Sequence, residues 1–597
     1  MGEIVGPRMR GGNVTFRWMA PPTAEADDAD SRADRDWDHE VDVVVVGSGF
    51  GGMTTALRAA HHGLDVVVLE KMPSYGGSSA LSGGGVWIPN NPVNVRAGLD
   101  DSVERARTYM GAIVGDRVPQ SRVDAFLAAG PAAMRFLERE TRWVRFMRVA
   151  GYADYHPEEP GGEPTGRTVE PVPLDARKLG EDEDTLLRNP MMKAPAGMYV
   201  TQAEYRKLTQ VLTTWQGRAA GMRIGVRTAV LKLLRRRMIA LGAAGMGRFR
   251  LALRDAGIPL WLETPMEGLV VEDGRVLGVR VTRDGAERTI RARRGVVLAA
   301  GGFERNEAMR KEYQREPINA VWTSGAEGNT GDAIRAGMGL GAAVDLMDDA
   351  WWGPSIDTGG PGLFILAERS LPGAVVVNSQ GERYVNEASP YVDFVHRMYD
   401  VHGKDGASTI PSHLIVDQRY RNRYPFVQAP PRAPLPRWMT KFGIVTTADS
   451  LEELAEKIDV PADKLAATFA RVNEMAATGK DEDFGKGDSA YDRYYGDPAN
   501  KPNPCLAPIG DPPFYAFRLI PGDLGTKGGL VTDERARVLR DDGSTIAGLY
   551  AIGNTSASVM GRDYAGAGAT IGPAIAFGYV AADDLAAPAA AMSSAAT

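Results

Sequence analysis

The stretch that decides the fold is VDVVVVGSGFGGMTTALRAAHHGLDVVVLEK, residues 41–71. It opens with a β-branched run at residues 41–46, typical of a parallel strand buried on both faces. Gly47, Gly49 and Gly52 then form G-x-G-x-x-G ahead of a helix, and a second strand ends at Glu70. The glycines permit a tight turn and close approach of a pyrophosphate, which the helix N-terminus stabilises, while Glu70 can accept the ribose hydroxyls. The stretch therefore predicts a Rossmann-like α/β domain that binds a dinucleotide.

Three further glycine loops lie far apart along the chain. The first follows Glu70 and offers amides and hydroxyls near the phosphates, at Gly76, Gly77, Ser78, Ser79, Ser82 and Gly83. The second, after a strand at residues 295–298, contains Ala300, Gly301 and Gly302; the third, after residues 549–552, contains Gly553 and Asn554. An NAD domain normally continues with another βα unit, and no second G-x-G-x-x-G follows. Four separated loops around one long cofactor predict FAD.

Composition excludes several other classes of function. The net charge is −7 over 597 residues, which gives no global case for nucleic-acid binding. Cys505 is the single cysteine, so no internal disulfide forms, and a reducing cytoplasmic setting fits. The seven histidines show no metal-ligand spacing, which predicts no metal site. No secretory signal or apolar run of spanning length is present, and residues 1–40 and 587–597 are expected to be disordered.

The order of these motifs resembles the fumarate reductase/succinate dehydrogenase flavoprotein superfamily over nearly all of residues 41–585. That resemblance implies a discontinuous FAD-binding domain, at residues 41–318 and 520–586, with an α+β substrate or cap domain inserted at residues 319–519. No histidine lies near GGSSALSGG, residues 76–84, so we expect non-covalent FAD.

Four stretches narrow the resemblance to the 3-ketosteroid Δ1-dehydrogenases: GYADYHPEEPGG, NEASPYVDFVH, PGDLGTKGG and GRDYAGAGATIGPA. That family removes two hydrogens from C1 and C2 of a 3-ketosteroid, in steroid degradation. Carried over by position, its site comprises Tyr155, Tyr391, Tyr564 and the backbone amide of Gly568. An external electron acceptor, a quinone or another compound, is implied as a partner.

The chemistry explains why tyrosines suit this site. Tyr564 and the Gly568 amide would stabilise negative charge on O3, as an oxyanion hole does. Tyr391 would remove the C2 proton, and Tyr155 could donate a hydrogen bond to it, while C1 passes a hydride to flavin N5. The helix that opens near Thr570 and Ile571 would direct its amides at the flavin.

Aromatic side chains are expected to line the substrate site, namely Tyr152, Trp351 and Trp352. One loop departs from the family, which more often reads GRTYPGPGAT. Asp563, Ala565 and Ala567 replace a polar residue and two prolines. Loss of the prolines is expected to loosen the loop, and a carboxylate beside Tyr564 would oppose its ionisation without harming it as a hydrogen-bond donor.

Three other functions remain open. A 3-ketosteroid Δ4-dehydrogenase is separated least well by sequence. A fumarate reductase-like enzyme would need several Arg and His groups for two carboxylates, whereas the expected lining is apolar. A flavin-binding protein without dehydrogenase activity is disfavoured by the tyrosine set.

Residues 205–254 form a basic insert with twelve Lys and Arg and no acidic residue. Met222, Val226, Val230, Leu233 and Leu234 repeat at helical spacing. We interpret the opposite face as basic, from Arg223, Arg227 and Arg235. Such a helix binds an anionic membrane surface or is a solvated helix packed on the cofactor domain, and the sequence favours neither.

Overall fold

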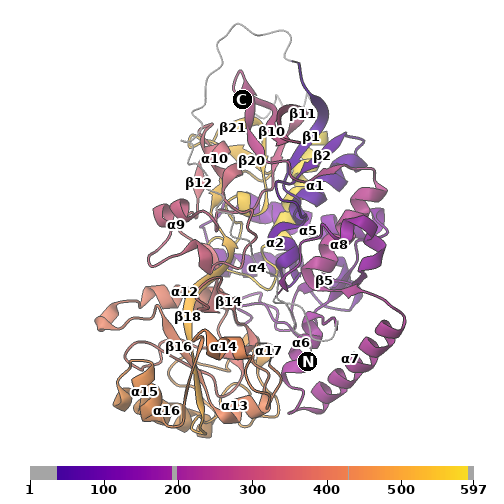
Figure 1. Cartoon of the computed structure of the whole chain (residues 1–597). Helices are drawn as coiled ribbons and strands as arrows, with labels where there is room; N and C mark the ends of the chain where they lie inside the picture. The colour runs from indigo at the N-terminus through magenta and orange to yellow at the C-terminus, as the bar shows by residue number, and fades with distance from the viewer. Residues whose placement is uncertain (1–35, 191–197, 428, 589–597) are drawn as a thin grey trace. The chain divides into compact units, whose positions relative to one another are not determined.

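A computed structural model describes residues 36–190, 198–427 and 429–588 (Figure 1). Nearly all of the predicted N-terminal extension and tail therefore lies outside the described residues. The exceptions include His39 and Glu40, which already belong to the first strand.

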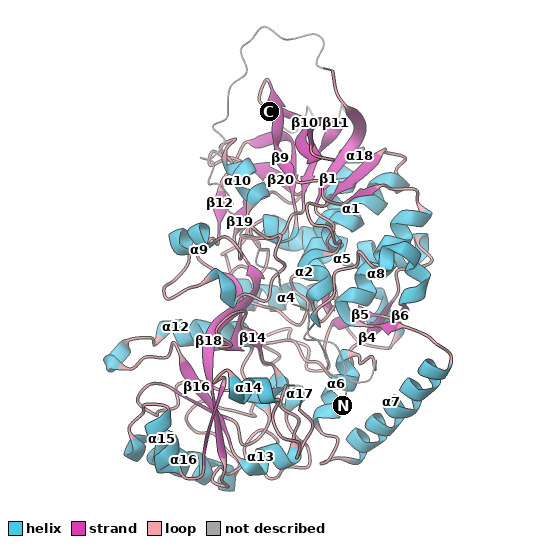
Figure 2. Ribbon diagram, in the orientation of Figure 1, coloured by secondary structure: helices cyan, strands magenta, loops and turns pink. Residues whose placement is uncertain are grey.

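The larger sheet has eight strands, and its centre is parallel (Figure 2). The order β21 (Thr545–Ala551), β11 (Ala286–Leu298), β1 (His39–Val46) and β2 (Val66–Leu69) is parallel throughout. On one side β8 (Leu260–Trp261) follows β2, and on the other β20 (Arg537–Leu539) pairs antiparallel with β21. A hairpin of β9 (Met266–Glu272) and β10 (Arg275–Arg283) joins β11. The valine run of β1 is buried on both faces, as predicted.

Four helices complete the core beside this sheet. They are α1 (Phe50–His61), α5 (Gln120–Glu140), α8 (Leu241–Asp255) and α18 (Ile571–Ala586). The helix α1 packs against both α18 and α8, and α18 also packs against α5. The last helix of the chain therefore covers the first one.

A second, antiparallel sheet lies in the intervening part of the chain. Its order is β14 (Leu363–Phe364), β13 (Ala350–Ile356), β18 (Phe514–Thr526), β16 (Ser412–Val416) and β15 (Val375–Val377). The strand β17 (Val445–Ala448) also pairs with β18. The helix α12 (Tyr391–Asp400) packs on β13, and α15 (Leu451–Lys457) packs on β17 and on α16 (Ala462–Thr478). The same part of the chain contains α17 (Ala490–Tyr495). This arrangement confirms the predicted fold class, a Rossmann-like domain interrupted by a cap.

The predicted domain boundaries stay predictions. Two observations bear on them: β21 lies directly beside β11 although the cap sequence separates them, and β18 runs without a break through residue 520. The predicted division between residues 519 and 520 thus falls inside one strand.

The predicted basic insert has two structurally different parts. Its second part, α8, is core: Phe249, Leu251 and Leu253 are fully buried. Its first part comprises α6 (Gln202–Thr209) and α7 (Trp215–Leu233), which pack on each other, and in Figure 1 α7 lies at the right-hand edge. In the part of the chain that is described, no helix is long and apolar enough to cross a membrane.

Candidate active site

The four predicted glycine loops meet at one edge of the large sheet. Val46 is in register with Leu69 on one side and Leu298 on the other, and Leu298 is in register with Ala551. Because carboxyl ends of parallel strands share an edge, the loops that follow these strands converge there. The loops contain Gly47, Glu70, Ala300 and Gly553, so this edge brings together one predicted cofactor residue from each of these strand ends.

The first loop leaves no space for side chains. A Cβ on Gly47 would lie 2.2 Å from the carbonyl oxygen of Ala299, and one on Gly52 would lie 2.1 Å from that of Gly47. Gly47 also has a φ of +114°, which favours glycine. The N-cap residue Gly49 provides no side-chain cap, although the Phe50 amide at the start of α1 donates to Ser79 Oγ. The N-terminus of this helix favours an anion through its dipole and its remaining amides.

The second loop is tied to the first through serines. Ser48 Oγ donates to Glu70 Oε2 at 2.5 Å and accepts from the Gly76 amide at 2.8 Å. Ser79 Oγ accepts from the Phe50 amide at 3.2 Å. Burial raises the pKa of Glu70, although bonds from Ser48 and Met72 oppose the rise. Glu70 is thus fixed at the end of β2, where a ribose can reach it.

The remaining loop residues have equally specific neighbours. Gly77 has a φ of +48°, Ser78 Oγ accepts from the Ala326 amide, and Ser82 Oγ donates to the Ser79 carbonyl. The Gly83 carbonyl accepts from Gln202, the Gly301 carbonyl accepts from Thr555, and a Cβ on Gly302 would lie 2.0 Å from Thr526 Oγ1. Thr570 and Ile571 open α18, as predicted.

The second part of the site is a cluster of tyrosine rings from three distant motifs. The ring centroids of Tyr155 and Tyr564 are 5.0 Å apart, those of Tyr155 and Tyr391 are 5.3 Å apart, and those of Tyr391 and Tyr564 are 5.4 Å apart. All three side chains are buried. The structure thus brings together the three tyrosines named from the sequence.

Their hydroxyls influence one another. Burial raises the pKa of Tyr391 well above its usual value, Tyr564 and Tyr152 raise it further, and Tyr155 opposes the rise. Burial also raises the pKa of Tyr564, opposed by hydrogen bonds from Tyr391, Thr570 and the Gly568 amide. The Tyr155 hydroxyl is buried without a hydrogen bond of regular geometry. A buried orphan hydroxyl in such a cluster is typical of a functional site.

The loop with Tyr564 is held by backbone hydrogen bonds. The Ala565 carbonyl accepts from the Tyr155 amide at 3.1 Å and from the Tyr109 hydroxyl at 2.8 Å. The Ala567 carbonyl accepts from Thr168 Oγ1 at 2.8 Å. These hydrogen bonds hold the backbone at both positions where proline is absent, and they oppose the expected loosening of the loop.

The aromatic residues predicted to line the substrate site do not all lie beside the three tyrosines. Successive side chains of β13 point to opposite faces. Trp351 packs on Tyr564 with centroids 4.9 Å apart, and its indole donates to Asn554 Oδ1. Trp352 instead packs on Tyr399 and donates to Asp349, away from the three tyrosines. Tyr152 lies 6.3 Å from Tyr155, centroid to centroid.

Sequence reasoning missed a neighbouring set of rings. Tyr491, at the start of α17, lies 4.7 Å from Tyr155, and Phe364 lies 5.4 Å from Tyr391, both between centroids. Tyr494 stacks on Tyr152 at 4.3 Å. The concentration of tyrosine in AYDRYY, residues 490–495, was the available signal.

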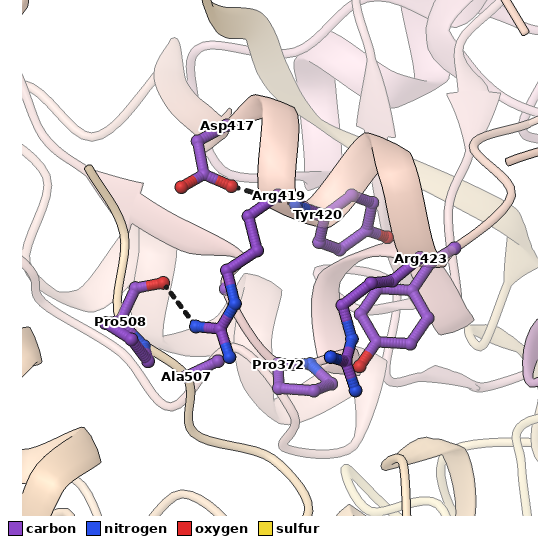
Figure 3. Close-up of a pocket in the computed structure, with 9 residues that line it drawn as sticks. Pro372, Asp417, Arg419, Tyr420, Arg423, Ala507 and Pro508 are labelled. Carbon is purple, nitrogen blue, oxygen red and sulfur yellow. Dashed lines mark hydrogen bonds between the residues drawn. The ribbon is translucent and has the colours of Figure 1, made fainter. Parts of the chain in front are cut away.

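Two other features of the molecule have the form of a ligand site or a metal site. Figure 3 shows a cleft lined by Pro372, Gly373, Asp417, Arg419, Tyr420, Arg423, Tyr424, Ala507 and Pro508. It has no room for a water molecule and contains none of the predicted residues, so we assign it no ligand. Among the described residues, His156, Asp393 and Asp563 have possible metal-donor atoms within 4.8 Å of one another.

Comparison with known proteins agrees with this geometry. A family model described as FAD binding domain matches residues 42–571. The 3-oxosteroid 1-dehydrogenase of Mycolicibacterium smegmatis is 50% identical over 560 residues, which cover 92% of this chain and 98% of the relative. The solved 3-ketosteroid Δ1-dehydrogenase of Sterolibacterium denitrificans, in complex with 1,4-androstadiene-3,17-dione, is 42% identical, with a TM-score of 0.87 over 92% of this chain and 99% of that one.

A more distant structure is similar in fold alone. The 3-ketosteroid Δ4-(5α)-dehydrogenase of Rhodococcus jostii is 23% identical, with a TM-score of 0.64 over 93% of this chain and 98% of that one.

The glycine-lined sheet edge and the family match together define a flavoprotein with an FAD-binding domain. The cofactor predicted from the sequence is thereby confirmed. At 50% identity over nearly the full length of both chains, the protein belongs to the 3-oxosteroid 1-dehydrogenase family.

Proposed function

We propose that the protein is an FAD-dependent enzyme that introduces a double bond between C1 and C2 of a 3-ketosteroid. The observation that carries this proposal is the contact of Tyr155, Tyr391 and Tyr564 in one buried cluster. Three phenols and a backbone amide can bind a ketone oxygen and accept a weakly acidic proton, which are the two requirements of this reaction.

Each residue has a distinct role in the proposed reaction. Tyr564 and the Gly568 amide donate hydrogen bonds to O3, and they bind it more tightly as negative charge develops. Tyr391 accepts the C2 proton after its own hydroxyl has ionised, and Tyr155 stabilises that ionised form. Bound FAD supplies the oxidising chemistry by taking up the hydride that leaves C1.

Two buried cations of this part of the chain are already paired, which does not favour a dicarboxylate substrate. Two substrate carboxylates require free cations. The buried Arg310 is paired with Asp523 at 2.6 Å, and the buried Lys527 is paired with Asp349 at 3.1 Å. Both cations are therefore committed to internal partners.

Anaerobic titration of the flavin tests the proposal. Androst-4-ene-3,17-dione should bleach the flavin absorbance, and succinate should not. The alternative Δ4 activity is separated with 5α-androstane-3,17-dione, whose product would be the 1-ene under our proposal and the 4-ene under the alternative. Bleaching by succinate alone would contradict the proposal.

We also propose that α7 binds an anionic membrane surface. Its apolar residues Met222, Val226 and Val230 are exposed, and Trp215 and Leu233 are 75% and 83% exposed. The opposite face, with Gly217, Ala220 and Ile224, is buried. A solvated helix would present polar residues outward, whereas a helix lying on lipid presents apolar ones.

Cations flank this apolar stripe. Arg218, Arg223 and Lys232 lie along α7, and Arg235 and Arg236 follow its end. Arg227 differs from our expectation because it turns inward, to Glu204 at 2.6 Å. Near the end of the helix Arg236 also lines a cavity of about 300 Å³ together with Arg142, Lys178 and Arg248. Such charges favour anionic lipid, and a quinone acceptor would be dissolved in the same phase.

A further inference from the structure

Three charged side chains gather beside the tyrosine cluster, and each is close in sequence to one of its members. His156 follows Tyr155, Asp563 precedes Tyr564, and Asp393 lies two positions after Tyr391 on α12. In space His156 Nε2 lies 3.8 Å from Asp393 Oδ2 and 3.8 Å from Asp563 Oδ1.

The arrangement places one imidazole between two carboxyl groups. The side chains of His156, Asp393 and Asp563 are 17%, 35% and 36% exposed, so water screens them only in part. Nε2 of His156 is buried and has no hydrogen-bond partner among the described residues. When the imidazole is protonated, it therefore acts on the two carboxyl groups through its charge and not through a hydrogen bond.

The surroundings of Asp563 disfavour its negative charge. Burial raises the pKa of Asp563, Asp393 raises it further, and His156, Lys527 and His396 lower it. Lys527 and His396, however, both contact the buried Asp349, at 3.1 and 2.8 Å. Of the cations that face Asp563, His156 is thus the one that also contacts Asp393.

The three side chains connect three separate parts of the site. Asp393 belongs to the helix that begins with Tyr391, and Asp563 belongs to the loop that contains Tyr564. The segment with His156 is fixed by its backbone, because the His156 amide donates to the Tyr109 hydroxyl at 3.2 Å. A charge held at His156 can therefore fix the cap helix α12 relative to the Tyr564 loop.

We propose that His156 is a positioning residue: as an imidazolium between Asp393 and Asp563, it holds Tyr391 and Tyr564 at their working separation. This inference rests on the proposed steroid dehydrogenation.

The test is a pair of substitutions, His156→Gln and Asp563→Thr, made singly and together. His156→Gln keeps a polar side chain but leaves two carboxylates facing each other without a cation. Turnover of androst-4-ene-3,17-dione should fall by about 5- to 30-fold, with KM changed less than about 3-fold and a larger isotope effect from deuterium at C2. Full FAD content and an unchanged Tm exclude misfolding.

The double variant gives the decisive comparison. In the Asp563→Thr background, His156→Gln should cost less than about 3-fold, because the repulsion that it exposes is gone. Equal losses in both backgrounds would overturn the inference. If His156→Gln does not fold, the variants Asp393→Asn and Asp563→Thr are used in its place. Their double variant should lose no more turnover than the worse of the two single variants. Additive losses of turnover would overturn the inference.

Two further outcomes are separate from these. If no 3-ketosteroid reduces the flavin of the wild-type enzyme, the proposed function is refuted, and the proposed role of His156 is refuted with it. A stoichiometric divalent cation in the purified enzyme, with turnover lost to a chelator, would overturn the inference because a metal ion would then join the carboxylates.

Discussion

The backbone amide of Tyr155 donates a 3.1 Å hydrogen bond to the carbonyl oxygen of Ala565. This bond joins two motifs that are far apart in the chain, and it places Tyr155 beside Tyr564 without using either hydroxyl. Neither hydroxyl is used in this backbone contact. The backbone thus sets the position of these two residues, and their hydroxyls can be removed by substitution without breaking this contact.

We expect Tyr391→Phe to lower turnover by about 100- to 10,000-fold, because it removes the group that accepts the C2 proton. Steroid binding should persist, since the ring remains. Tyr399→Phe is the matched control: Tyr399 is buried on the same helix, and its hydroxyl donates to the Pro317 carbonyl. A Tyr391→Phe enzyme as active as the Tyr399→Phe control would remove Tyr391 from the mechanism.

Tyr564→Phe should lower turnover by about 100- to 1,000-fold, because one of two donors to O3 is lost. The loss should fall on kcat more than on KM, since the developing enolate needs the donor more than the neutral ketone does. Tyr550→Phe, which removes a hydroxyl bound to Asp584, serves as control. Near-normal turnover by flavin-replete Tyr564→Phe would show that the phenol only packs.

The rate should depend on pH through Tyr391. Its pKa is raised, chiefly by burial, and the base is active when ionised, so kcat/KM should still be rising above about pH 8. Tyr155 lowers that pKa. Tyr155→Phe should therefore move the rise to higher pH, as measured by initial rates in overlapping buffers. A profile that is flat from neutral to alkaline pH, or a shift of the opposite sign, would contradict these roles.

The glycine loop gives a prediction about the cofactor. Gly52→Ala would place a Cβ 2.1 Å from the Gly47 carbonyl, so α1 must shift, and FAD binding should weaken by roughly 10- to 100-fold. Gly111→Ala, where a Cβ meets nothing within 4 Å, is the control. The flavin-to-protein absorbance ratio measures both.

Acid precipitation of the wild-type protein should release all flavin to the supernatant, because no histidine lies near GGSSALSGG, residues 76–84, in the sequence. A pellet that stays yellow would show a covalent bond and refute the non-covalent prediction.

The α7 face can be tested with lipid. The protein should pellet with phosphatidylglycerol vesicles at low salt and be released as salt screens the charges. Met222→Ser with Leu233→Ser should weaken binding by roughly 10-fold or more. Phe442→Ser, at a residue that is 67% exposed and lies outside α7, should change nothing. Failure of the wild type to pellet would exclude lipid as the partner of this face.

Local spacing predicted the tight geometry of the first glycine loop, because G-x-G-x-x-G fixes its own backbone shape. Gly47 and Gly52 lie where backbone comes within 2.2 Å of a notional Cβ, as the pattern requires. The convergence of Tyr155, Tyr391 and Tyr564 is different, since no spacing along the chain relates them. It was available only from the resemblance to a family.

Orientation was the property that sequence could not supply. Trp351 and Trp352 are adjacent in a strand, so one of them must face away, and the pair does not reveal which. The apolar residues of α7 are a similar case. Their helical spacing was visible in the sequence, but whether they face solvent depends on which side of α7 packs on α6. Arg227 turned inward because Glu204 lies there.

The parallel pairing of β21 with β11 has a consequence for how the protein is made. A ribosome completes the whole cap before it releases β21, so residues 296–298 have no partner on that side until residues 549–551 have emerged. The surfaces of α1 and α5 that α18 covers are exposed for the same period. An open edge beside apolar helices attracts other chains. We therefore expect a polypeptide interrupted before Thr545 to depend on chaperones, and the nascent enzyme to gain its cofactor only after release.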